Sequence, residues 1–82
     1  MLKIQRFASD TSIVFVLSGR IETENVTQLE SLITAECNPI VFDMKEVNLV
    51  SQEVVQFLGR CENDGITIQN CPPYIREWIA RE

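Results

Sequence analysis

Residues that support covalent and metal chemistry are scarce in this sequence. It contains three cysteines, Cys37, Cys61 and Cys71, and no histidine. Without histidine, neither a Ser-His-Asp nor a Cys-His nucleophile can be assembled, and a Cys/His zinc site is excluded. An odd number of cysteines with no CxxC pair is unlike a disulfide framework. The sequence therefore predicts three small, mostly buried thiols, with no metal and no cofactor.

Phosphate chemistry is also poorly supported. The only glycines are Gly19, Gly59 and Gly65, so no glycine-rich loop can hold a phosphate group. Asp43 follows an apolar run, as the phosphoacceptor of a response regulator does. Such a site also needs an acidic pair near the end of the first strand, where this chain has Gln-Arg-Phe at 5–7. We interpret Asp43 as a solvated residue at a strand end.

Two pairs of carboxylates are candidates for acid–base catalysis, Glu22 with Glu24 and Glu46 with Glu53. Acidic residues at helix starts, where the helix dipole favours negative charge, explain both pairs more simply. The sequence therefore predicts a protein that is not an enzyme. An enzyme would need a pocket with convergent carboxylates or an activated cysteine.

Length and charge narrow the class of partner. The length of 82 residues predicts one domain spanning 1–82. The net charge is −5 and no cluster of Lys and Arg forms a basic stripe, so nucleic acid is a poor partner. Basic protein surfaces suit such a chain better. No apolar run reaches about 18 residues, so no membrane insertion is expected. The start does not resemble a signal peptide, and we expect a cytoplasmic protein.

The first half of the chain predicts two strands and a helix. Ile4–Phe7 is typical of a short strand, and Ile13–Leu17 is a continuous apolar run, typical of a strand buried on both faces. Apolar residues at helical spacing predict a helix over Glu22–Glu36. Ile40–Phe42 is a further buried strand that should stop at Asp43.

The second half predicts a capped helix, a strand and a last helix. Ser51 is a good N-cap, followed by an apolar stripe that includes Leu58, and Asn63-Asp64-Gly65 should end this helix. Ile66–Ile68 should form a strand. A helix should start at Pro72-Pro73. Its Tyr74 and Trp78 should be buried at the edge of the core, and the alternative is that they form a binding hot spot.

The predicted order is ββαβαβα. Right-handed crossovers between the later strands give a four-stranded, mostly parallel, mixed sheet with about three helices on one face, an α/β fold. The binding surface in such a fold should lie in the strand-to-helix loop before the second helix, Val47 to Glu53, and on the exposed side of that helix.

Three stretches resemble the STAS family, the anti-sigma-factor antagonists of bacteria. They are Val14–Glu22, Ile40–Val50 and Gly65–Asn70, the last followed by Pro73 and an amphipathic helix. The resemblance spans nearly the whole chain, which is shorter than typical members. It implies a non-catalytic protein-interaction module in signal transduction and transcription regulation, with an anti-sigma factor or kinase-like protein as partner.

The resemblance also implies a regulatory position. The family opens its second helix with Asp-Ser-Ser-Gly, whose second serine is phosphorylated, and this stretch falls on Ser51-Gln52-Glu53-Val54. Glu53 is then the phosphoacceptor equivalent, it cannot be phosphorylated, and the switch is lost. The simpler alternative is that Glu53 is only a favourable first-turn residue.

The expected partner-binding residues are Asn48, Ser51, Gln52, Glu53, Gln56 and Arg60. The alternative function is a structural module, either a STAS-like accessory subunit of a membrane transporter complex or a homodimeric scaffold. Family members of that kind also lack the phosphoserine.

Overall fold

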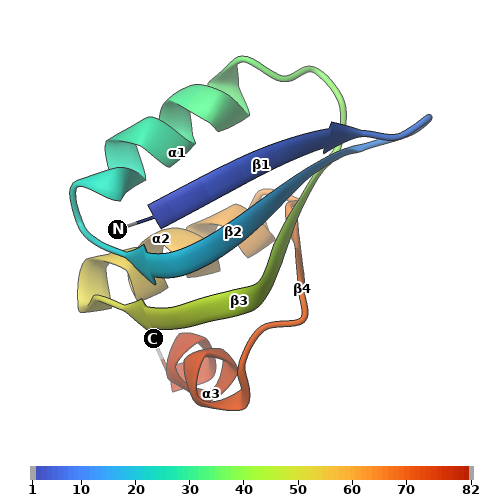
Figure 1. Cartoon of the computed structure of the whole chain (residues 1–82). Coiled ribbons are helices and arrows are strands. Elements are labelled where there is room, and N and C mark those ends of the chain that lie inside the picture. Colours follow the sequence, from blue (N-terminus) through green and yellow to red (C-terminus); the bar gives the residue numbers. More distant parts are fainter. Residues whose placement is uncertain (1, 82) are drawn as a thin grey trace.

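The computed structural model describes residues 2–81 and has the predicted element order (Figure 1). The elements are β1 (Leu2–Ala8), β2 (Ile13–Ile21), α1 (Asn25–Thr34), β3 (Ile40–Val50), α2 (Gln52–Asn63), β4 (Thr67–Gln69) and α3 (Pro73–Arg81). They form a four-stranded sheet in the order β1-β2-β3-β4. β1 and β2 are antiparallel, and the other two strand pairs are parallel. The α/β fold with a mixed sheet is confirmed.

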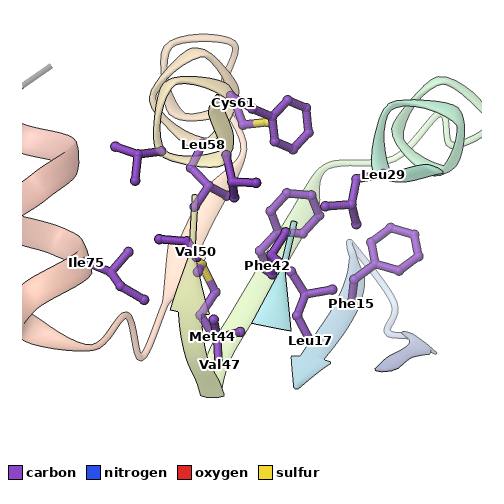
Figure 2. Close-up of a cluster of buried hydrophobic side chains, with 14 of the residues drawn as sticks. Phe15, Leu17, Leu29, Phe42, Met44, Val47, Val50, Leu58, Cys61 and Ile75 are labelled. Atoms are coloured by element: carbon purple, nitrogen blue, oxygen red, sulfur yellow. The ribbon is translucent and has the colours of Figure 1, made fainter. Parts of the chain in front are cut away.

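The core lies between one face of the sheet and the three helices. Alternate residues of the two central strands point into it, and Phe15, Leu17, Phe42 and Met44 are fully or almost fully buried (Figure 2). Ile75 brings α3 onto the same core. The prediction that Ile13–Leu17 is buried on both faces is wrong, because the intervening valines of β2 remain partly exposed on the other face.

β3 is much longer than predicted. It does not stop at Asp43 but continues to Val50, because Met44, Val47 and Val50 keep burying side chains in the core. The buried residues of β3 lie two residues apart up to Met44 and three residues apart after it. The pairing of β3 with β2 shifts register where this spacing changes. Asp43 lies within β3, and its carboxylate accepts hydrogen bonds from the Lys45 backbone N–H and the Asn70 side-chain amide. The predicted loop from Val47 to Glu53 is therefore wrong, and Ser51 alone separates β3 from α2.

The helix boundaries follow local hydrogen bonds. α2 begins after Ser51, and Gly65, with φ of +99°, follows its end, as predicted. α1 is shorter than Glu22–Glu36 because residues 22–25 close a turn, in which the Asn25 side chain accepts the Glu22 N–H at 2.8 Å. β4 lies one residue later than predicted. α3 starts at Pro73, as expected.

Candidate functional site

Ser51 caps the N-terminus of α2. Its backbone is extended, with φ of −89° and ψ of 169°, and its Oγ accepts the Val54 N–H at 3.4 Å. The predicted N-cap is confirmed. The cap satisfies one of the free backbone donors that every helix start presents.

Thr23 connects this cap to Glu53. The Thr23 hydroxyl donates to Glu53 Oε2 at 3.3 Å, and its Oγ1 lies 3.2 Å from Ser51 Oγ. Because a carboxylate only accepts, the Thr23 proton goes to Glu53 and the Ser51 proton goes to Thr23 Oγ1. The connection after β2 thus holds the first turn of α2. Sequence reasoning missed Thr23, which is 30 residues from Glu53 and fell inside a predicted helix.

The exposed side of α2 is polar throughout. Gln52, Glu53, Gln56 and Arg60 are all exposed, whereas the opposite side of the helix is buried. Together with Ser51, five of the six predicted site residues therefore lie on one surface. The ion pairs among residues 2–81 use Arg6, Arg20, Arg76 and Arg81, and leave the Arg60 guanidinium without an acidic partner.

Asn48 is placed differently from the other five. It lies on β3, where its backbone carbonyl accepts a hydrogen bond from the Tyr74 hydroxyl of α3. This bond attaches the start of α3 to the sheet. Tyr74 itself is half exposed, so only Trp78 of the two aromatic residues packs against the core edge as predicted.

Leu49 is an exposed apolar residue beside the cap, and sequence reasoning missed it. Half of its surface is exposed. It lines a hollow of about 180 Å³ together with Arg20 and Ser51. A larger hollow of about 600 Å³ lies between the C-terminal ends of α1 and α2, with Arg60 on its wall. Leu49 therefore adds one apolar side chain to an otherwise polar surface.

The cysteines do not form a nucleophilic centre in the part of the chain that the structure describes. Cys61 is buried, and burial, with Asp64 nearby, raises the pKa of its thiol to about 12. Burial also raises the pKa of Cys71, which is half-buried, and Cys37 is exposed. Within residues 2–81, no three Cys, Asp or Glu side chains converge as a metal site. No helix in that range is long and apolar enough to cross a membrane.

Comparisons with known proteins bear on the fold. No family model and no curated protein sequence matches the chain. Among solved structures it is similar to the anti-sigma factor antagonist SpoIIAA in its unphosphorylated form, with 20% identity and a TM-score of 0.73 over 96% of this chain and 79% of that one. It is also similar to an uncharacterized DUF3478 protein with a SpoIIAA-like fold from Shewanella loihica PV-4, with 17% identity and a TM-score of 0.54 over 98% and 74% of the two chains. The chain therefore has the STAS-like fold of an anti-sigma factor antagonist.

Proposed function

We propose that this chain is a non-catalytic protein-interaction module of the anti-sigma-factor-antagonist type. Its binding surface is the start and exposed side of α2, formed by Leu49, Ser51, Gln52, Glu53, Gln56 and Arg60. The observation that carries the proposal is the combination of a polar, exposed helix face with one exposed leucine at its N-terminal end. Protein–protein interfaces commonly have an apolar centre surrounded by a polar rim.

Glu53 gives this surface a permanent negative charge. It lies in the first turn of α2, where the helix dipole stabilises an anion by about 0.3–1 kcal/mol. A phosphoserine would carry about −1.5 to −2 at the same place. The bond from Thr23 orients the carboxylate at the helix start. The module therefore presents one fixed charge state and does not switch by phosphorylation at this position.

The partner is an anti-sigma factor or a related kinase-like protein with a basic contact surface. The chain has a net charge of −5, so a basic surface is attracted over long range. Close to the helix, Glu53 and Arg60, whose guanidinium has no acidic partner among residues 2–81, specify the alignment of the two proteins. Electrostatic complementarity of this kind acts mainly on specificity and association rate.

The test is a calorimetric titration with the purified anti-sigma factor kinase of the same genome. Glu53→Arg should weaken binding by about tenfold or more, because a charge reversal at a close contact costs more than about 1.4 kcal/mol. Asp10→Arg makes the same charge change at an exposed residue between β1 and β2, and should leave the affinity within about 0.5 kcal/mol. Equal effects of the two substitutions would show that α2 is not the binding surface.

A second assay addresses the missing switch. The protein is incubated with ATP and the same kinase and then analysed by mass spectrometry. We expect no phosphate on the start of α2, because Glu53 has no hydroxyl and the Ser51 hydroxyl is already bonded to the Val54 N–H and to Thr23 Oγ1. Phosphate on Ser51 would contradict this part of the proposal, because the N-cap of α2 would then be the phosphorylated residue.

A further inference from the structure

The face of the sheet that no helix covers carries an apolar centre. Phe7 on β1 is 54% exposed, and Val14, Val16 and Val41 beside it are partly exposed. In Figure 1 this face is turned away from α2, which passes behind β2. Sheets made only of parallel strands are normally covered on both faces, and three of the four strands here, β2, β3 and β4, are parallel to one another. The continuous apolar run 13–17 is typical of a doubly covered strand, yet the structure covers only one side.

The register of the strands places three rows of side chains across this open face. The first row is Phe7, Val14, Val41 and Thr67, the second is Gln5, Val16, Asp43 and Gln69, and the third is Lys3, Ser18 and Glu46. Within each row, β1 and β3 flank β2 on opposite sides. The β1 side carries the positive charge of Lys3, and the β3 side carries the negative charges of Asp43 and Glu46, with the exposed Lys45 between them at the register shift.

This pattern is complementary to itself. A two-fold axis running along β2 between two stacked sheets exchanges β1 of one copy with β3 of the other. Phe7 then packs on the second copy's Val41, and Gln5 faces its Asp43. Lys3 faces the second copy's Glu46, while Val14 and Val16 meet their own counterparts. The first two rows therefore join groups that can pack or form hydrogen bonds, and the third row joins Lys3 to Glu46.

We propose that the open sheet face is a homodimer interface, occupied by a second copy of this chain across a two-fold axis along β2. A two-fold dimer uses the same patch on both subunits, as this arrangement does. Burial of the valines and Phe7 supplies the energy, and the two Lys3–Glu46 contacts fix the register. The helices lie on the other side of the sheet, so α2 stays accessible in the dimer.

The test is the oligomeric state, measured by sedimentation velocity and light scattering over a range of protein concentrations. The unmodified chain should dimerise. Val16→Glu should give a monomer, because two carboxylates would meet at the axis, and its circular dichroism and thermal melt should stay close to those of the unmodified chain. A persistently monomeric wild type, or a dimer that persists in Val16→Glu, would overturn the proposal; the latter dimer would use another surface, such as the edge of β1.

Charge exchange tests the two-fold arrangement itself. Lys3→Glu and Glu46→Lys should each raise the dissociation constant by about tenfold or more, since each opposes like charges twice per dimer. The double variant should recover most of the affinity, because it restores both pairs. Arg81→Glu, the same type of reversal on α3, serves as the control and should have no effect. Failure of the double variant to recover would refute this packing of the two copies.

Discussion

Replacing Ser51 with alanine should remove the cap of α2 while leaving its buried stripe intact. The hydroxyl accepts the Val54 N–H at 3.4 Å and lies 3.2 Å from Thr23 Oγ1. Loss of a serine N-cap costs about 0.5–2 kcal/mol. Because the bond to Val54 is long and Ser51 is only partly buried, we expect a loss of about 1 kcal/mol in the free energy of unfolding. In a domain of this size, that lowers Tm by roughly 4–8 °C.

The assay is urea unfolding followed by far-ultraviolet circular dichroism. Ser51→Asp keeps an N-cap and should stay within about 0.5 kcal/mol of the unmodified chain. Ser31→Ala, at an exposed position inside α1, controls for the general effect of removing a hydroxyl from a helix. If Ser51→Ala is no less stable than Ser31→Ala, Ser51 does not cap the helix and the geometry proposed for the binding surface is wrong.

Three further measurements probe other parts of the structure. Gly59→Ala should stabilise the protein by roughly 0.5–1 kcal/mol in urea unfolding, because an added Cβ meets no atom within 4 Å and alanine favours a helix interior; a destabilised variant would contradict this. Hydrogen bonds from Arg6 lower the pKa of the Glu36 carboxyl group in the folded protein. The pair therefore stabilises the fold fully above the unfolded-state pKa of Glu36, and this contribution is lost as the pH falls through its folded-state pKa. Glu36→Gln should flatten the acid side of a Tm–pH profile, and an unchanged profile would show that the pair contributes nothing. In thiol labelling of the native protein, exposed Cys37 should react well before buried Cys61, whose pKa is raised to about 12; equal rates would indicate that α2 opens readily.

Local signals in the sequence were sufficient to predict the order of the helices and strands and the bounds of α2. Ser51 as N-cap and Gly65 beyond the helix end are determined by residues within one turn of each boundary. The exposed side of α2 then follows from the helical period alone. Five of the six predicted site residues therefore lie where the sequence predicted them.

The errors arose where distant contacts override local composition. Asp43 resembles a strand end, but its carboxylate is bonded to Lys45 and Asn70, and the burial of Val47 and Val50 continues β3. Nothing near Thr23 in the sequence indicates its bond to Glu53, because the two meet only when β2 and β3 lie side by side.

The central claim, that α2 presents the binding surface, is tested most directly by backbone amide NMR of the labelled chain during titration with the anti-sigma factor kinase. We predict that the largest chemical-shift changes fall on Leu49, Ser51, Glu53, Gln56 and Arg60, with Asp10 and the open sheet face unchanged. Shift changes confined to the open face or to α3, with α2 unaffected, would contradict the account.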